Sequence, residues 1–354
     1  MEGMPLVKVR MIVPANVRHR SGGNIYNARL VESLRAQGAE VAVHSLDGGW
    51  PSGTAADKSH LAAALAGDNL SICIVDGLIA TGAPTEIETA TATGRRVWVL
   101  LHMPLSGEQP LEKRALRAAT GLLCTGSGTA EAAKRWGLPN VHVATAGADR
   151  PGKRAIPGGP GGRPRPSGAS EAPHFIMVGA LLPNKDQIFF VEELARIKDL
   201  AWTAAVVGST TADPSYSAAV RERIFRHGLE KRVELRGELS GPALEEQWLR
   251  ADLSLLISHS ESFGMVVQES LAHGIPVVVR KGTGAVEALG AHGAGEAIDL
   301  APGTGSLAEM LQRWLSDSAL RKRWQDAAAA ASQALPRWEE TAREVLRIVT
   351  GTHH

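Results

Sequence analysis

Short apolar runs alternate along the chain with longer stretches in which apolar residues recur every three or four positions. The short runs predict buried strands and the longer stretches predict amphipathic helices, the first over residues 25–37 with Gly38 as its end. Strands that are apolar throughout and separated by helices are typical of a parallel sheet covered on both faces. In the first part of the chain, strands are predicted over residues 7–14, 40–45, 71–76, 96–101 and 121–125.

The alternation stops at residues 151–173, which are rich in Pro and Gly and nearly free of large apolar side chains. Such a segment has little apolar surface to bury, so we expect a linker there. The alternation then resumes with a helix over 187–197, and the chain ends in a helical stretch over 318–350, broken at Leu335-Pro336. Further strands are predicted over residues 174–178, 202–208, 232–235, 253–258 and 276–280.

The sequence therefore predicts an α/β protein with two Rossmann-like domains, over residues 1–150 and 174–335, and a terminal helical segment over 336–354. Ligands of open α/β sheets bind beyond the carboxyl ends of the strands. We expect the active site in a cleft between the two domains.

Composition excludes some classes of protein. Of 354 residues, 44% are hydrophobic and 21% are charged, as in soluble globular proteins. The net charge of +1 creates no general attraction for nucleic acid, so no nucleic-acid partner is expected. The start of the chain lacks the long apolar core of an export signal, and no apolar stretch could span a bilayer, which favours a cytoplasmic protein. Cys73 and Cys124 lie in apolar runs and are predicted to be buried thiols, with a disulfide or catalytic pair as the alternative.

The stretch from Ser258 to Val278 carries the strongest chemical signal. Its pattern predicts the end of a strand, a turn with Gly264, a helix, and a glycine stop before the next strand. Free amides and the helix dipole at such a helix start favour phosphate oxygens. Glu261 precedes the helix and Glu269 lies eight positions later within it, so one carboxylate can meet a sugar and the other a ribose. A capped helix with two surface glutamates is the alternative.

With these residues the chain resembles the retaining glycosyltransferases of the GT-B fold, and most of all their family four, which carries an E-x7-E motif. Glu261 and Glu269 match that motif. Arg337 to Glu340 is similar to the family's terminal helix, which crosses back onto the N-terminal domain, and Trp338 there is expected to be a packing residue. Other segments match in the same order along the chain: Gly22-Gly23, His102 after a strand, 125–127, 146–149, Gly179 to Asp186, and 235–239.

The resemblance implies a role for each matching residue. Glu269 binds the ribose hydroxyls and Glu261 the donor sugar, while Lys185 and the amides of glycine loops and a helix start bind the diphosphate. His102 acts near the reacting centre, so His102, Glu261 and Lys185 form the expected catalytic set. The expected donor-binding residues are Gly22, Gly23, Gly179, Lys185, Gly237, Glu238, Leu239, Glu261, Ser262, Phe263, Gly264, Met265 and Glu269.

The implied reaction is transfer of a sugar from a nucleotide diphosphate sugar to an acceptor hydroxyl with retention, by a front-face route. The nucleotide sugar is a co-substrate, and no further cofactor and no metal is expected, because Lys185 and helix amides replace the ion. The acceptor class stays open between a small molecule, a glycan and a lipid-linked molecule. Lys113, Arg114 and Arg117 form a basic helical stripe, which predicts a solvated face or, as the alternative, a peripheral membrane or anionic-acceptor contact.

One position departs from the family pattern. Ala180 stands where the family has an arginine, which removes a bidentate donor to the diphosphate. Three alternatives follow: Lys185 alone suffices, a cation from elsewhere such as Arg280 or Lys281 takes its place, or the diphosphate site is weakened. Two other interpretations remain: a nucleotide-sugar-binding module that has lost its chemistry, and a sugar-nucleotide epimerase.

Overall fold

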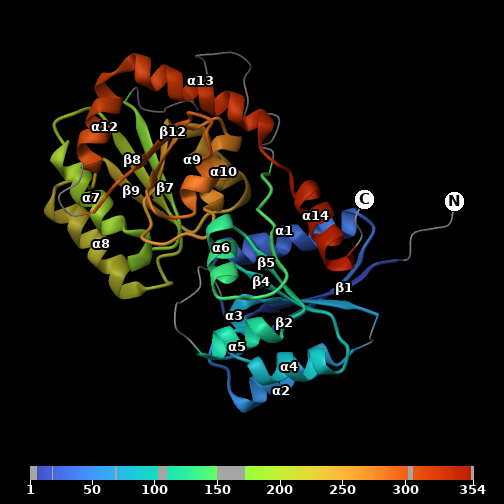
Figure 1. Cartoon of the computed structure of the whole chain (residues 1–354). Helices are drawn as coiled ribbons and strands as arrows, with labels where there is room; N and C mark the ends of the chain where they lie inside the picture. Colours follow the sequence, from blue (N-terminus) through green and yellow to red (C-terminus); the bar gives the residue numbers. More distant parts are fainter. Residues whose placement is uncertain are drawn as a thin grey trace. The chain divides into compact units, whose positions relative to one another are not determined.

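The computed structural model describes residues 6–17, 19–67, 70–102, 110–149, 172–301 and 306–351. Contacts divide the chain into two units, each built around one parallel sheet (Figure 1). The N-terminal unit comprises Met1–Arg18, Gly22–Gly147 and Pro336–His354, and the C-terminal unit comprises His19–Ser21 and Ala148–Leu335. All but the last two residues of the predicted linker over 151–173 lie outside the described residues.

The N-terminal unit has a six-stranded parallel sheet of order β2-β1-β3-β4-β5-β6. Its inner strands are buried along their whole length, which explains their continuous apolar sequences. In chain order its elements are β1 (Lys8–Pro14), α1 (Gly22–Ala36), β2 (Glu40–Leu46), α2 (Ala55–Leu65), β3 (Ile72–Asp76), α3 (Gly77–Ala80), α4 (Pro84–Ala92), β4 (Val97–Leu101), α5 (Pro110–Ala118), β5 (Gly121–Cys124), α6 (Ser127–Arg135), β6 (Val141–Val143) and α14 (Trp338–Thr350).

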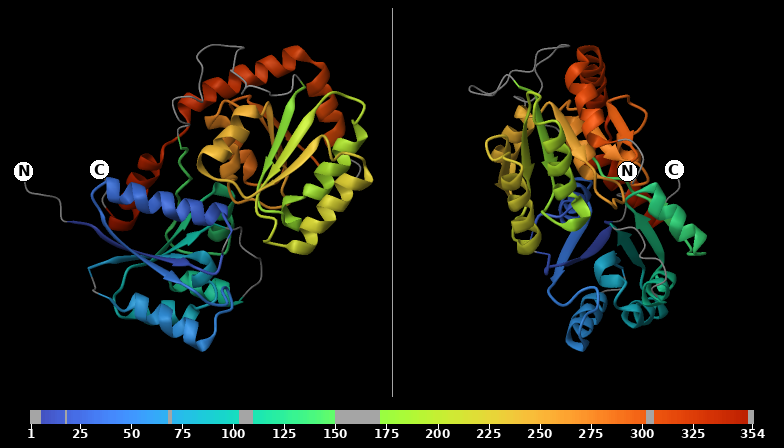
Figure 2. Two further views of the ribbon diagram at one scale, coloured as in Figure 1. Left: turned by 180° about the vertical axis from the view of Figure 1, so that it is seen from behind. Right: turned by 90° about the vertical axis from the view of Figure 1, so that its left-hand side faces the viewer.

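Helix α14 completes this unit from the far end of the chain. It lies with α1 on one face of the sheet, whereas α2 and α4 lie on the other (Figures 1 and 2). The rings of Tyr26 and Trp338 meet edge to face at 5.1 Å, and Thr341 Oγ1 donates to the carbonyl of Thr145 at 2.9 Å. Trp338 is therefore a buried packing residue, as predicted.

The C-terminal unit has a second six-stranded parallel sheet, of order β12-β11-β10-β7-β8-β9. In chain order its elements are β7 (His174–Val178), the short 3-10 helix η1 (Pro183–Lys185), α7 (Gln187–Arg196), β8 (Thr203–Val207), α8 (Pro214–Arg226), β9 (Val233–Gly237), α9 (Gly241–Arg250), β10 (Leu253–Leu256), α10 (Met265–Ala272), β11 (Val277–Arg280), α11 (Ala285–Leu289), β12 (Gly295–Ile298), α12 (Leu307–Ser316) and α13 (Ser318–Ala334).

Alternation along β7 separates the two cores of this sheet. Phe175 and Met177 pack into the larger core with α7, α8 and α12, whereas Ile176 points to the other face and packs with Trp248 of α9. Both predicted parallel sheets are thus confirmed. Strands β6 and β12, the short edge strands, were not predicted.

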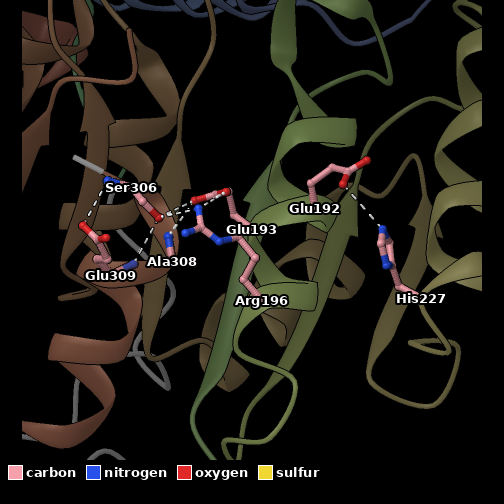
Figure 3. A network of polar contacts seen from close by, with 7 residues as sticks. All are labelled: Glu192, Glu193, Arg196, His227, Ser306, Ala308 and Glu309. Carbon is pink, nitrogen blue, oxygen red and sulfur yellow. Dashed lines mark hydrogen bonds and ion pairs between the residues drawn. The ribbon is translucent and has the colours of Figure 1, made fainter. Parts of the chain in front are cut away.

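A buried carboxylate joins α7 to the start of α12 (Figure 3). Glu193 Oε2 accepts hydrogen bonds from Ser306 Oγ at 2.8 Å and from the Ala308 amide at 2.9 Å, and Arg196 donates to Oε1 at 3.0 Å. Burial alone would raise the pKa of Glu193, but these donors outweigh it and lower the pKa. Glu193 therefore stabilises α12 as an ionised helix cap.

Candidate functional site

Lys185 and Glu261 meet at the carboxyl edge of the C-terminal sheet. Lys185 ends η1, which follows β7, and Glu261 lies in the loop after β10. Lys185 Nζ donates to Glu261 Oε1 at 2.5 Å, with side-chain exposures of 25% and 15%. Because β7 and β10 are neighbours in the sheet, the two loops start side by side. The structure therefore brings these two predicted site residues together in a partly buried ion pair.

The two loops are also tied through their backbones. The His259 amide donates to the Asn184 carbonyl at 2.8 Å, and Asn184 Nδ2 donates to the Ser260 carbonyl at 3.2 Å. These bonds hold the lysine and the glutamate in register independently of their charges.

Asp186, which was not predicted, adds a second ion pair beside the first. Its backbone is left-handed, with φ of 62°, and its carboxylate pairs with Arg280 and, at 3.2 Å, with His259 Nε2. Arg280, the last residue of β11, also donates from Nε to the Ile257 carbonyl at 2.7 Å. The ends of three strands are thus joined at one edge of the sheet.

The turn before α10 requires glycine at Gly264. Its φ is +89°, and a Cβ atom there would lie 3.0 Å from Leu256 Cδ2 and 3.1 Å from Ala285 Cα. Among the described residues no side chain caps the helix start, and Val267 donates its amide to the Gly264 carbonyl at 2.9 Å. The amides of Met265 and Val266 at this helix start favour an anion. Ser262 and Phe263 are buried beside it, whereas Met265, the first helical residue, is partly exposed.

Glu269 is the most perturbed carboxyl group of this region. Burial raises its pKa to about 7, although the charge of His273 acts in the opposite direction. Within the residues that the structure describes, its carboxylate accepts no hydrogen bond. A carboxylate in this setting gains strongly from hydroxyl donors.

The other donor-site residues of this unit lie at the ends of β7 and β9. A Cβ atom on Gly179 would lie 3.6 Å from Lys185 Cδ, so this glycine faces the lysine side chain. Gly237 ends β9, two strands away; Glu238 is exposed and Leu239 packs with the α9 and α10 core. Among the described contacts, none joins Gly237, Glu238 or Leu239 to the Lys185–Glu261 pair. Ala180 is buried and accepts a hydrogen bond from Gln187 through its carbonyl.

His102 lies in a separate polar cluster at the carboxyl edge of the N-terminal sheet. Its Nε2 is 2.8 Å from Asn27 Oδ1 and 3.4 Å from Asp76 Oδ2. Asn27 Nδ2 also donates to Asp76 at 2.7 Å. Burial would raise the pKa of Asp76, but the His102 charge and the hydrogen bonds from His102, Asn27 and Leu78 together lower it. Asp76 is therefore an ionised partner that orients His102.

Gly22 and Gly23 belong to the first turn of α1 and not to a loop before it. The predicted helix start at residue 25 was thus late, because glycines in a first turn carry no apolar pattern. A Cβ atom on Gly23 would lie 3.2 Å from His102 Cδ2, so only a small residue fits against the imidazole.

Sequence reasoning missed Asp76, Asn27 and Asp186. A signal existed for Asp76, because it ends a buried apolar strand, where a charged residue is rarely found without a partner. Within the described residues no cluster of His, Cys, Asp or Glu has the geometry of a metal site. No helix in the same ranges is long and apolar enough to cross a membrane.

The basic stripe on α5 is engaged within the N-terminal unit. Arg114 makes a bidentate pair with Glu88, with Nε–Oε1 at 2.6 Å and Nη2–Oε2 at 2.5 Å. Lys113 Nζ lies 5.8 Å from the centre of the Trp136 ring. These contacts favour the interpretation of a solvated protein face.

Comparison with known proteins finds a family model that matches part of the chain and several similar proteins. Residues 164–331 match the family model described as glycosyl transferases group 1. A D-inositol 3-phosphate glycosyltransferase of Jonesia denitrificans is 28% identical over 191 residues, which cover 52% of this chain. The match spans 44% of that relative's length, less than half of it.

Solved structures resemble nearly the whole chain. A sucrose-phosphate synthase from Thermosynechococcus elongatus has a TM-score of 0.78 at 17% identity and covers 98% of both chains. The Anabaena protein Alr3699/HepE, solved in complex with UDP and glucose, has a TM-score of 0.77 at 18% identity and covers 98% of this chain and 100% of its own. The GT-B fold is thereby confirmed, and the match to the glycosyl transferases group 1 model covers most of the C-terminal unit.

Proposed function

We propose that the chain is a retaining, metal-independent glycosyltransferase of family four that transfers a sugar from a nucleotide diphosphate sugar to an acceptor hydroxyl. The observation that carries the proposal is the Lys185–Glu261 pair beside the uncapped start of α10. A cation, free helix amides and a carboxylate at one sheet edge suit a diphosphate joined to a sugar.

In this proposal the positively charged and hydrogen-bond-donating groups of the site bind the phosphates. Bond breaking places positive charge on the sugar and negative charge on the leaving diphosphate, so donors fixed at the phosphates lower the barrier. Lys185 and the amides after Gly264 are those donors in the C-terminal unit. Glu261 then accepts hydrogen bonds from the donor sugar, and the leaving phosphate takes the acceptor proton in a front-face reaction.

Glu269 suits the ribose. Its enclosed carboxyl has no donor among the described residues, and two ribose hydroxyls would supply a pair. Alr3699/HepE is solved with UDP, which makes UDP-sugars the first donors to test.

His102 is assigned to the donor sugar or the acceptor near the reacting centre. Asp76 and Asn27 hold its ring in place beside the carboxyl edge of the sheet. The acceptor is a small molecule, a glycan or a lipid-linked molecule, and the relative named for D-inositol 3-phosphate makes that polyol phosphate a first candidate. Peripheral membrane contact through α5 is the alternative to the solvated face favoured above, and co-sedimentation with anionic vesicles tests it.

A binding module without catalysis is the second candidate. Ala180 is buried and uncharged at the same sheet edge, so the C-terminal unit has one cation fewer there than an arginine would give. Binding without turnover would be the outcome that selects this candidate.

Purified protein, incubated with UDP- and GDP-sugars and a panel of acceptors, tests the proposal by release of nucleoside diphosphate. We expect turnover that survives EDTA, a product with the anomeric configuration of the donor by NMR, and loss of turnover in Lys185→Ala. Lys322→Ala is the matched control, because Lys322 forms an exposed pair with Asp326 on α13. Turnover that depends on a divalent ion, or an inverted product, would contradict the mechanism.

A further inference from the structure

Arg280 makes two side-chain contacts at the sheet edge that carries Lys185. Its guanidinium lies across the end of β10, with Nε bonded to the Ile257 carbonyl and Nη2 to Asp186 in the loop after β7. The side chain is only 14% exposed, so these contacts are shielded from water. A planar guanidinium can make two such bonds at once, whereas an ammonium group has no equivalent fork.

Asp186 links this contact to the lysine. It follows Lys185 directly and holds a left-handed backbone, which costs free energy for a residue other than glycine. As the N-cap residue of α7 it makes no capping hydrogen bond with its side chain. The carboxylate is used instead for Arg280 and His259.

Lys185 directly precedes this turn. The turn at Asp186 sets where η1 ends and α7 begins, and the lysine side chain leaves the backbone one residue earlier. Lys185 Nζ is then placed at 2.5 Å from Glu261. Loss of the Arg280–Asp186 pair would release the turn, and the lysine would have to be ordered at the moment of ligand binding.

We propose that Arg280 is a positioning residue for donor binding, which holds Asp186 in its left-handed turn and thereby points Lys185 at the diphosphate. The inference rests on the proposed function, because it concerns the same site. It assigns Arg280 an indirect role: the guanidinium acts through Asp186 and Lys185 and does not contact the phosphates.

Calorimetry measures the Kd of a nucleoside diphosphate and the Kd of the matching nucleoside. The Kd of the nucleoside divided by the Kd of the diphosphate gives the contribution of the diphosphate group as a ratio. The probe is UDP or GDP, whichever wild-type protein binds more tightly, with uridine or guanosine as its partner. We expect Arg280→Gln and Asp186→Asn each to lower the ratio about tenfold, the usual scale for a charge-assisted contact. Arg313→Gln, which removes an exposed pair with Glu296 in the same unit, is expected to leave the ratio unchanged.

The combination with Lys185→Ala decides between an indirect and a direct role. If Arg280 acts through Lys185, Arg280→Gln in the Lys185→Ala background causes no further loss beyond about twofold. A further tenfold loss in that background would overturn the proposal and place the guanidinium on the phosphates. An Arg280→Gln protein with the same ratio as wild type would also overturn the proposal. If that variant does not fold by circular dichroism, Asp186→Asn carries the same comparison. If the ratio measured for the wild-type protein itself is near one, the diphosphate adds nothing to binding. That result would reject the proposed function and the positioning role with it.

Discussion

The ammonium group of Lys185 lies 2.5 Å from Oε1 of Glu261, and the two residues come from loops 76 positions apart in the sequence. Each charge is thus neutralised by the other while the pair stays partly buried. A diphosphate at the same place would compete with Glu261 for the lysine and leave the carboxylate to hydrogen-bond a neighbouring hydroxyl.

Glu261→Gln should therefore separate binding from turnover. With the competing charge removed, we expect the affinity for a nucleoside diphosphate to stay equal or to rise a few fold, because Lys185 is freed. Turnover of the nucleotide sugar should fall about a hundredfold, since a charged acceptor of hydrogen bonds near the sugar is lost. Calorimetry and product release measure the two effects, and a weakened affinity for the diphosphate would contradict the competition.

Glu269→Gln should stabilise the free protein in a pH-dependent way. Burial raises the Glu269 pKa from 4.5 to about 7, so the folded protein retains a proton that the unfolded chain releases. Stability of the wild type therefore falls as pH rises from 4.5 through 7, and the neutral glutamine avoids this loss.

We expect the variant to match wild type near pH 4 and to exceed it above the folded pKa by up to about 3 kcal/mol. Urea unfolding at both pH values checks this, with Glu222→Gln, an exposed residue paired with Arg226, as control. An equal difference at both pH values would show that charge is not the cause.

Asp76→Asn should affect turnover more than substrate binding. Asparagine preserves the shape but removes the charge beside His102. Its single acceptor oxygen also cannot serve Asn27 and His102 on one side and the Leu78 amide on the other, as the two carboxylate oxygens do. We expect kcat to fall about tenfold to a hundredfold with KM nearly unchanged. A double variant with His102→Ala should be no slower than His102→Ala alone, and additive losses would mean that Asp76 acts separately.

Glu193→Gln should destabilise the C-terminal unit at neutral pH. Ionised Glu193 accepts bonds from Ser306, Ala308 and Arg196, and we expect a loss of about 1–3 kcal/mol. Because the folded pKa is lowered below 4.5, the contribution is complete above that pH and disappears as pH falls through the folded value. Thermal unfolding at a series of pH values from 7 downward measures it; a difference that does not change with pH at any point would exclude the ionised cap.

Continuous apolar sequence made the inner strands predictable, because strands buried on both faces leave no room for polar residues. Two of the edge strands had no such signal: β6 has three residues including His142, and β12 contains Gly295 and Glu296. Each sheet could therefore be predicted with one of its edges, β2 or β9, whereas the opposite edges, β6 and β12, could not.

The residues of the candidate site could be predicted where they lie close together in the sequence after one strand. They could not be predicted where the order of the strands in the sheet brings distant residues together. Glu261, Gly264 and Glu269 lie in one continuous segment, which a sequence shows directly. Asp186 and Arg280 are 94 residues apart and meet because β10 separates β7 from β11 by a single strand. Asp76 and His102 likewise meet because β3 and β4 are neighbours, as their register shows.

The N-terminal unit is assembled from segments at both ends of the sequence, since Trp338 of α14 packs on Tyr26 of α1. During synthesis, the apolar face of α1 must therefore wait for the whole C-terminal unit to leave the ribosome before α14 covers it. The N-terminal unit, whose first strands are synthesised before the C-terminal unit, is therefore completed after it. Premature termination anywhere before Pro336 would leave a nascent chain with an exposed apolar face and make it a substrate for chaperones and proteases.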